Sequence, residues 1–223
     1  MTIINTNYHP IDQATWPRRE YFYYFTKMMP TGFTVNATID ITATLDWTHR
    51  HEVKFNAAYL FLVSQVLTRH PEFRLGMVDD QLVEFDVVHP SYSVLHEDDH
   101  SISNLWTAYS PDFSQFYQDY LQDLKHFGSQ HTPMPKAPQS ANLYMIGSIP
   151  WLDFTSYTPL PFTPLNTYFP VIQAGQYTTQ DGKTTMPLSF TIHHAVADGY
   201  HVSQFYQDLR AAMAQPEAWL TTD

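Results

Sequence analysis

The sequence contains no cysteine, few basic residues and no long apolar run. Without cysteine the chain can form no disulfide and can use no thiol as a nucleophile. Its 11 Lys and Arg residues are scattered along the chain and are outnumbered by 22 Asp and Glu residues. The clustered positive charge of a nucleic-acid-binding face is therefore missing, and we expect no nucleic-acid partner. An anionic cofactor would need only one or two local positive groups, which an acidic protein can supply.

Membrane-targeting signals and phosphate-binding loops are missing as well. No apolar run reaches the length of a membrane span, and residues 1–7 lack the basic-then-apolar order of a signal peptide. We therefore expect a cytoplasmic protein with no membrane partner. No Gly-rich loop indicates a dinucleotide-binding fold or a P-loop. With 223 residues, 43% of them hydrophobic, the chain can bury a sizeable core, and we expect one domain over residues 1–223.

Hydrophobic periodicity predicts strands and amphipathic helices that interleave along the chain. Strands are expected over residues 32–40, 92–95, 142–149, 170–177 and 186–192, a hairpin over 75–88 with its turn at 79–81, and helices over 55–67, 113–124 and about 201–213. Ser110 is expected to cap the second helix, with Pro111 in its first turn. Segments 128–141 and 156–170, which are rich in proline, are predicted to be loops and not domain linkers.

Residues 189–199 carry the strongest candidate for catalysis. His194 continues the apolar alternation of Phe190 and Ile192, so its imidazole is expected on a covered strand face, where a neutral ring is favoured. A neutral imidazole held in one tautomer is what a general base needs. His193 points to the opposite side of the strand, so the two histidines cannot share one metal ion, and no cysteine completes a zinc site. On these residues alone, a structural histidine pair before an Asp-Gly turn is the commoner interpretation.

The motif HHAVADG at residues 193–199 resembles the HHxxxDG active-site signature of the chloramphenicol acetyltransferase family. The resemblance extends over about 200 residues in the family's order and nearly its spacing, which is the length of a whole domain. Its other blocks are residues 16–20, 39–42, 54–55, 70–74, 91–97 and 150–151. The resemblance implies an α/β fold, a two-layer sandwich with a mixed β-sheet, as in coenzyme A-dependent acyltransferases. It also implies that His194 is the general base.

The family pattern gives Arg18 a role that its local sequence does not. Arg18-Arg19-Glu20 alone is typical of a solvated helix face. In the resembled enzymes, the arginine two residues after the tryptophan pairs with the aspartate of the motif, which is Asp198 here. Such a pair fixes backbone geometry through bidentate hydrogen bonds. The resemblance therefore assigns Arg18 and Asp198 to orienting the active site.

Substrate-binding residues also follow from the resemblance. Without the family, the aromatic and thioether patch after residue 20 would be assigned to the core. The family's acceptor pocket maps to Tyr24, Phe25, Met29, Thr31 and Tyr157. Lys54 and Tyr177 match positions that face coenzyme A, although Lys54 alone could be an exposed lysine at a helix start. The tyrosine that accompanies this lysine in the family is Asn56 here.

Two polar positions of the family's active site carry different residues in this chain. Gly147 replaces a serine credited with a hydrogen bond to the oxyanion, and Gln173 replaces a threonine. Ser148 follows the position of the family serine by one residue. Its side chain is therefore expected on the other face of the strand unless Gly147 permits a β-bulge. Together with Phe25, which replaces a tyrosine, these changes predict weak acetylation of chloramphenicol and a rise in turnover for Gly147→Ser. A backbone amide or a water molecule at Gly147 is the alternative source of the missing donor.

The resemblance as a whole implies transfer of an acetyl group from acetyl-CoA to a hydroxyl of a small apolar acceptor, chloramphenicol or a related alcohol. It implies no permanently bound cofactor, no acyl-enzyme and a role in antibiotic resistance. It further implies a homotrimer in which His194 faces the acceptor pocket of the neighbouring subunit. Two alternatives remain open: a dihydrolipoamide acyltransferase core, which shares HxxxDG, and a catalytically silent trimer that binds small molecules on the same scaffold.

Overall fold

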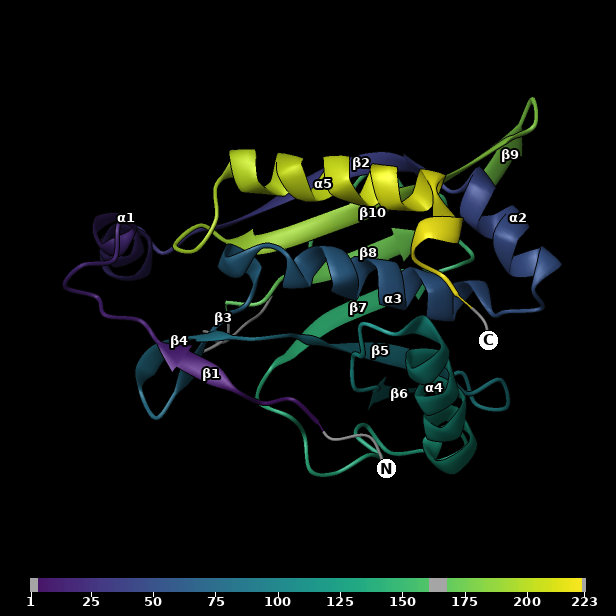
Figure 1. Cartoon of the computed structure of the whole chain (residues 1–223), viewed down its shortest axis with the longest axis horizontal. Coiled ribbons are helices and arrows are strands. Elements are labelled where there is room, and N and C mark those ends of the chain that lie inside the picture. Colours follow the sequence, from purple (N-terminus) through teal and green to yellow (C-terminus); the bar gives the residue numbers. More distant parts are fainter. Residues whose placement is uncertain (1–3, 161–167, 222–223) are drawn as a thin grey trace.

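The computed structural model describes residues 4–160 and 168–221, so part of the predicted loop over 156–170 lies outside the described residues. Its helices are α1 (Arg19–Tyr23), α2 (Thr42–Arg50), α3 (Phe55–Thr68), α4 (Phe113–Phe127) and α5 (Gly199–Ala214), with short helical turns at Tyr24–Met28, Pro71–Phe73 and Pro216–Ala218. Its strands are β1 (Tyr8–Pro10), β2 (Gly32–Asp40), β3 (Leu75–Val78), β4 (Gln81–Phe85), β5 (His89–Leu95), β6 (Ile102–Trp106), β7 (Leu143–Ile149), β8 (Val171–Gly175), β9 (Thr178–Gln180) and β10 (Lys183–His193). Figure 1 shows their arrangement.

The described strands form one large and one small sheet. The large sheet has the order β2-β10-β8-β7-β5-β6, with β9 beside β10. The β5–β7 and β7–β8 pairs are parallel and the other pairs are antiparallel, so the sheet is mixed. The small sheet has the order β1-β4-β3. Asp79 and Asp80 both have positive φ between β3 and β4, as a two-residue hairpin turn requires.

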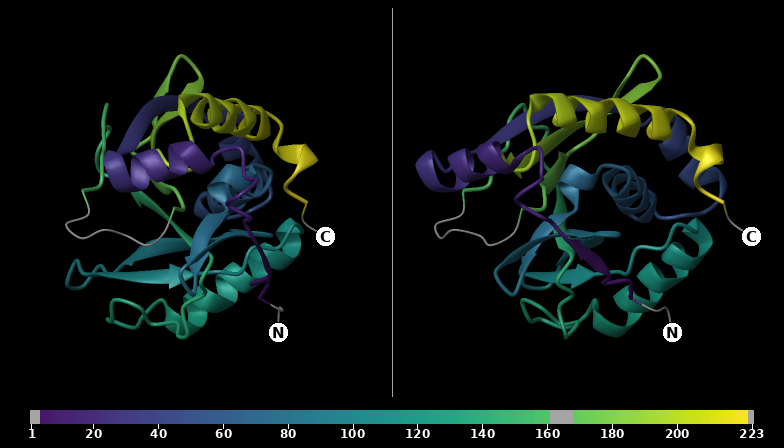
Figure 2. Two further views of the ribbon diagram at one scale, coloured as in Figure 1. Left: turned by 90° about the vertical axis from the view of Figure 1, so that its left-hand side faces the viewer. Right: turned by 60° about the vertical axis from the view of Figure 1, so that its left-hand side comes forward.

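Helices cover one face of the large sheet. On β10 the side chains of Phe190 and Ile192 point to this face and are buried, and the Phe190 ring packs 4.5 Å from the Phe205 ring in α5. Helix α3 is buried along most of its length and lies between α5 and α4 (Figure 2). This layer of helices on a mixed sheet confirms the predicted two-layer α/β sandwich.

On the opposite face of the sheet, Tyr157 and Tyr168 contact residues of β10. Ser189 of β10 points to this face, and its hydroxyl donates to the Tyr157 carbonyl at 2.8 Å. The His193 ring meets the Tyr168 ring edge-on at 5.2 Å. This face of β10 therefore carries polar side chains, whereas the helical face carries the apolar core.

One predicted helix start and one predicted helix cap were wrong. Helix α5 begins at Gly199 and not at about His201, because Asp198 is its N-cap. Helix α4 is capped by Asp112, whose carboxylate accepts the Ser114 N–H at 2.9 Å, and not by Ser110. Ser110 instead accepts the Asp112 N–H at 3.2 Å, so Pro111 precedes the helix. In the described part of the chain, no helix has both the length and the apolar character needed to cross a membrane.

Candidate active site

The turn that joins β10 to α5 is held by the guanidinium of Arg18. Its Nη1 and Nη2 atoms donate to the two carboxylate oxygens of Asp198 at 2.6 and 2.7 Å. Nη2 also donates to the His194 carbonyl, and Nε donates to the Ala195 carbonyl, both at 2.9 Å. Figure 1 shows this turn next to α1, which Arg18 immediately precedes. The expected contact between Arg18 and Asp198 is present, and one side chain fixes both ends of the turn.

His194, the first residue after β10, is confined by two aromatic rings. Its imidazole stacks on Phe25, with ring centroids 4.0 Å apart and planes 5° apart, and Phe33 lies 4.9 Å away. Its backbone N–H donates to the Thr31 carbonyl at 2.8 Å. The side chain is 29% exposed, so the ring is restrained while part of it remains accessible. Phe33 was not identified from the sequence, where it is one apolar residue of a strand.

The environment of Nδ1 in the His194 ring favours one tautomer. Nδ1 lies 3.2 Å from Oδ1 of Asp198, but it is buried and the two groups are not aligned as a hydrogen bond. Hydrogen bonds from Arg18 hold the pKa of the Asp198 carboxyl below its usual range, although burial acts in the opposite direction. A carboxylate that stays charged beside Nδ1 favours a proton on that nitrogen and leaves a lone pair on Nε2.

His193, the first residue of the motif, and His201, two residues after it, make structural contacts. Nδ1 of His193 accepts the Ala195 N–H at 3.1 Å, and burial lowers the pKa of His193. Nδ1 of His201 accepts the Asp198 N–H at 3.0 Å, at the start of α5. The predicted orientation of His193 away from His194 agrees with its packing on Tyr168. The contact of His201 was not predicted, although a polar residue three positions after a cap is a common signal for it.

The residues assigned to the acceptor pocket form two separate groups. Phe25 and Thr31 contact His194, and Tyr24 and Met29 lie beside them with exposed side chains.

The second group lies around the middle of the sheet and consists of Tyr157, Gly147 and Gln173. There Ser189 contacts Tyr157 and pairs with Gln173, which in turn pairs with Gly147. Ser189 is four residues before His193, which is about 13 Å along a strand. Within one chain, the second group does not contact His194.

The two residues assigned to coenzyme A lie near each other. Lys54 is the N-cap of α3, and the next residue, Phe55, packs its ring 6.2 Å from the exposed Tyr177 ring. The Lys54 side chain makes no capping hydrogen bond. The N-terminus of α3 adds a positive helix dipole to this surface, although the Lys54 N–H donates to the Tyr117 hydroxyl and the Ala57 N–H donates to the Lys54 carbonyl. Positive charge, an aromatic ring and a positive helix dipole therefore gather at one place that an anionic ligand could use.

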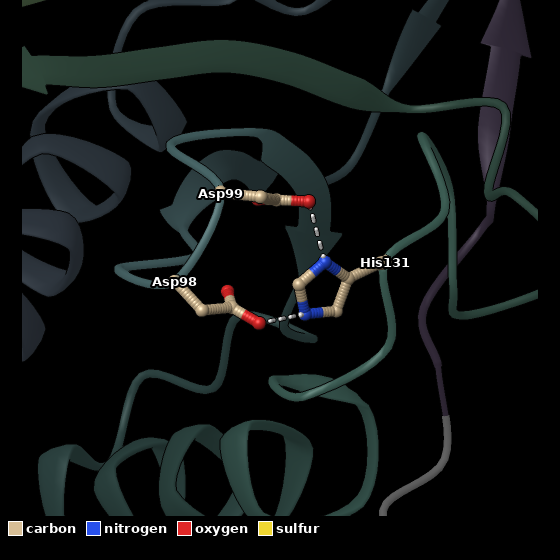
Figure 3. A group of neighbouring side chains, drawn as sticks. All are labelled: Asp98, Asp99 and His131. Atoms are coloured by element: carbon tan, nitrogen blue, oxygen red, sulfur yellow. Dashed lines mark hydrogen bonds and ion pairs between the residues drawn. The ribbon is translucent and has the colours of Figure 1, made fainter.

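In the part of the chain that the structure describes, Asp98, Asp99 and His131 form one group with the composition of a metal site (Figure 3). All three are exposed. His131 Nδ1 lies 3.0 Å from Asp99 and its Nε2 lies 3.6 Å from Asp98, so both ring nitrogens already face carboxylates. Hydrogen bonds from Ser101 and His131 lower the pKa of Asp99. We interpret the group as an ion pair that ties segment 128–141 to the turn after β5.

Comparison with known proteins identifies the family. The family model described as chloramphenicol acetyltransferase matches residues 6–210. The chain belongs to the chloramphenicol acetyltransferase family. Relatives with this name from Klebsiella sp and Escherichia coli are each 36% identical to it over 205 residues, which cover 92% of this chain and 93% of theirs. A relative with this name from Clostridium perfringens is 32% identical over 211 residues, 94% of this chain and 96% of its own.

Solved structures support the same fold. One named chloramphenicol acetyltransferase has a TM-score of 0.84 at 23% identity and covers 93% of this chain and 100% of its own. A dihydrolipoamide acetyltransferase from Azotobacter vinelandii has a TM-score of 0.66 at 16% identity, with coverage of 86% and 84%. The predicted resemblance to the chloramphenicol acetyltransferase family is confirmed, and the chain is an acyltransferase of this family.

Proposed function

We propose that this chain transfers the acetyl group of acetyl-CoA to a hydroxyl of chloramphenicol or a related small alcohol, and so contributes to antibiotic resistance. The observation that carries the proposal is the restrained His194 ring, which stacks on Phe25 and has Nδ1 3.2 Å from the Asp198 carboxylate. Arg18 holds that carboxylate with two short hydrogen bonds. This arrangement supplies an imidazole whose free lone pair lies on Nε2, as a general base requires.

The proposed reaction proceeds in a ternary complex. Nε2 of His194 removes the hydroxyl proton while the acceptor oxygen attacks the thioester carbonyl, so a C–O bond forms. The carbon–sulfur bond then breaks, and the departing sulfur takes the proton back from His194. Arg18 and Asp198 act as positioning residues, because their contacts fix the backbone and charge around the ring and do not reach the reacting atoms.

The separation of the two acceptor groups supports sites shared between subunits of a homotrimer. Gln173 and Tyr157 both contact or pair with Ser189, which is five residues before His194 in one chain, roughly 16 Å along an extended strand. A neighbouring copy could present its Tyr157 group to this His194. A mixture of His194→Ala and Gly147→Trp subunits tests the arrangement, since hybrid trimers would contain some intact sites. Recovery of activity after refolding the two inactive variants together is expected, and its absence would contradict shared sites.

Acetyl-CoA fits the surface around Lys54 as a co-substrate. Lys54 supplies positive charge, the α3 N-terminus supplies a positive helix dipole, and Phe55 with Tyr177 supplies an aromatic surface. We assign Lys54 and Tyr177 to this role. Lys54→Ala should raise the KM for acetyl-CoA with little change in kcat, because the lysine is proposed to bind and not to react.

Release of free CoA from acetyl-CoA tests the function directly. The acceptors are chloramphenicol, a panel of small alcohols and dihydrolipoamide, each measured with wild type and His194→Ala. Release that depends on an alcohol and is lost in the variant is the expected result. Preference for dihydrolipoamide would indicate the lipoamide-dependent alternative. Binding of chloramphenicol without any CoA release would indicate the silent small-molecule-binding trimer.

A further inference from the structure

Gly147 and Gln173 are a sterically matched pair across two parallel strands. They are Cα partners in the pairing of β7 with β8. A Cβ added to Gly147 would lie 2.9 Å from the amide end of the Gln173 side chain, so the flexible end of that side chain would have to shift. Gln173 therefore occupies the space that a serine at position 147 would need. The two departures from the family pattern are therefore in contact, and a side chain at position 147 would displace the Gln173 amide.

The hydrogen bonds around Gln173 determine how its amide is oriented. With the oxygen directed to β7, it accepts the N–H groups of Ser148 at 3.0 Å and Ile149 at 3.2 Å. The reverse orientation places the oxygen against acceptors and gives the NH2 group only a long hydrogen bond of 3.4 Å to the Ala174 carbonyl, so it is less favourable. In the favourable orientation, the atom 2.9 Å from the Cβ position of residue 147 is Nε2. An N–H donor of Gln173 therefore lies next to the position where the side chain of a serine would begin.

We propose that the NH2 group of Gln173 donates a hydrogen bond to the oxyanion formed during acetyl transfer, a role that rests on the proposed function. The thioester oxygen gains negative charge when the alcohol attacks, and a donor fixed in advance stabilises that charge. Two backbone N–H groups hold the other end of the amide, so its direction is set before the substrate binds. Gln173 also shares Ser189 as a neighbour with Tyr157, which places it beside the proposed acceptor pocket. The donor keeps its proton throughout, so the balance of the reaction is unchanged.

This pairing reverses the expected effect of Gly147→Ser. The serine Cβ would push the Gln173 amide out of its position, so the substitution removes one donor while it introduces another. We expect Gly147→Ser alone to lower kcat. Gly147→Ser combined with Gln173→Thr frees the space and places a hydroxyl in it, so the double variant should recover activity relative to Gly147→Ser.

Two substitutions of Gln173 separate its donor from its structural contact. Gln173→Glu keeps an oxygen that can accept from Ser148 and Ile149 but loses the NH2 group. Gln173→Met has a similar length and loses both. We expect kcat to fall by about 10²-fold or more in both variants, as for the loss of an oxyanion donor. The thermal midpoint should fall only in Gln173→Met, and the KM for acetyl-CoA should change little in either.

The outcomes distinguish this role from the proposed function. If wild type transfers acetyl groups and Gln173→Glu keeps kcat within about threefold, the donor role is refuted while the function stands. If both variants lose stability and activity in parallel, Gln173 is structural and the proposal fails. If wild type transfers no acetyl group to any acceptor, the proposed function is refuted and the donor role with it.

Discussion

At the scale of single residues, the adjacent His193 and His194 are expected to differ in their effect on catalysis. His194→Ala removes the proposed base, while the Arg18 hydrogen bond to the His194 backbone carbonyl can remain. We expect kcat to fall by about 10²–10⁴-fold or more, with the fold and assembly retained. CoA release and size-exclusion chromatography measure the two properties. His193→Ala is the matched control and should change kcat only a few-fold, because Nδ1 of His193 contacts the Ala195 backbone. Activity of His194→Ala close to that of wild type would exclude this mechanism.

The ion pair between Arg18 and Asp198 can be isolated by a double-mutant cycle. Arg18→Ala and Asp198→Asn should each lower activity and the free energy of unfolding, and the double variant should lose less than the sum. The Arg18 side chain is 16% exposed and that of Asp198 is 40% exposed, so the pair is only partly desolvated. We therefore expect a coupling of roughly 1–3 kcal/mol, the range for charged hydrogen bonds, and not the larger cost of a fully buried pair. Additive losses would show that the two residues stabilise the turn independently.

At the scale of elements, one lysine holds the proline-containing segment 128–141 against α4 and β6. Lys136 Nζ donates to both carboxylate oxygens of Asp123 in α4 at 2.7 and 2.8 Å, and to the Trp106 carbonyl at 3.0 Å. Nζ also lies 4.0 Å from the centre of the Trp106 ring. Asp123 accepts a further hydrogen bond from Thr107 at 2.9 Å. The segment is therefore a fixed part of the sandwich.

Replacing Lys136 alone should lower the free energy of unfolding more than replacing both Lys136 and Asp123. The side chains of Lys136 and Asp123 are 18% and 12% exposed, so Lys136→Met leaves a largely buried carboxylate without its cation. We expect a loss of about 3 kcal/mol in the free energy of unfolding, and partial recovery in Lys136→Met with Asp123→Asn. Urea unfolding measures both. Equal stability of the two variants would mean that the Asp123 charge is satisfied without Lys136.

Local periodicity predicted the elements with strong patterns and missed those without one. The strand over 32–40 and the helix over 55–67 agree with β2 and α3 to within one residue, because their apolar residues repeat at strand or helix spacing. Helix α2 was missed, since its sequence TATLDWTHR contains few apolar residues. Strand β1 was also missed, because its three residues become a strand only by pairing with β4, far along the chain.

The candidate site shows a sharper limit of sequence reasoning. Arg18 and Asp198 are separated by 180 positions, so no local pattern could pair them, and only the family resemblance did so. Gly147 and Gln173 were identified as two separate departures. Their steric match depends on the register between β7 and β8 and on side-chain volume across that pair. Such contacts follow from the assembled sheet and not from either strand alone.

At the scale of the whole molecule, a buried histidine ties the N-terminal segment to the sheet. His89 Nε2 lies 3.0 Å from the Asn5 carbonyl, and Nδ1 accepts the Tyr109 N–H at 3.0 Å. Asn142 donates to the same Asn5 carbonyl at 2.9 Å. Because Nδ1 accepts a backbone N–H, the ring is neutral with its proton on Nε2. Burial lowers the pKa of His89 to about 4.

This neutral ring predicts how stability depends on pH. The unfolded chain binds a proton at His89 below about pH 6.5, whereas the folded chain binds it only near pH 4, so stability falls as the pH is lowered through this window. The slope is about 1.4 kcal/mol per pH unit. His70 does not obscure this slope. Glu72 and Asp208 raise the pKa of His70 in the folded chain, so the stability that it contributes is already fully present below the ordinary pKa of histidine. The lowered pKa of His193 acts in the same direction as that of His89.

Urea unfolding of wild type and His89→Gln between pH 7 and pH 4.5, at one protein concentration, measures the contribution of His89. Glutamine can still accept the Tyr109 N–H but cannot titrate, so the variant should be less stable at pH 7 and lose less stability on acidification. The remaining slope should reflect His193 and fall further in a double variant with His193→Gln. Parallel losses in wild type and His89→Gln would mean that folded His89 takes up its proton at the ordinary pH, and therefore that its hydrogen bond from the Tyr109 N–H breaks on mild acidification.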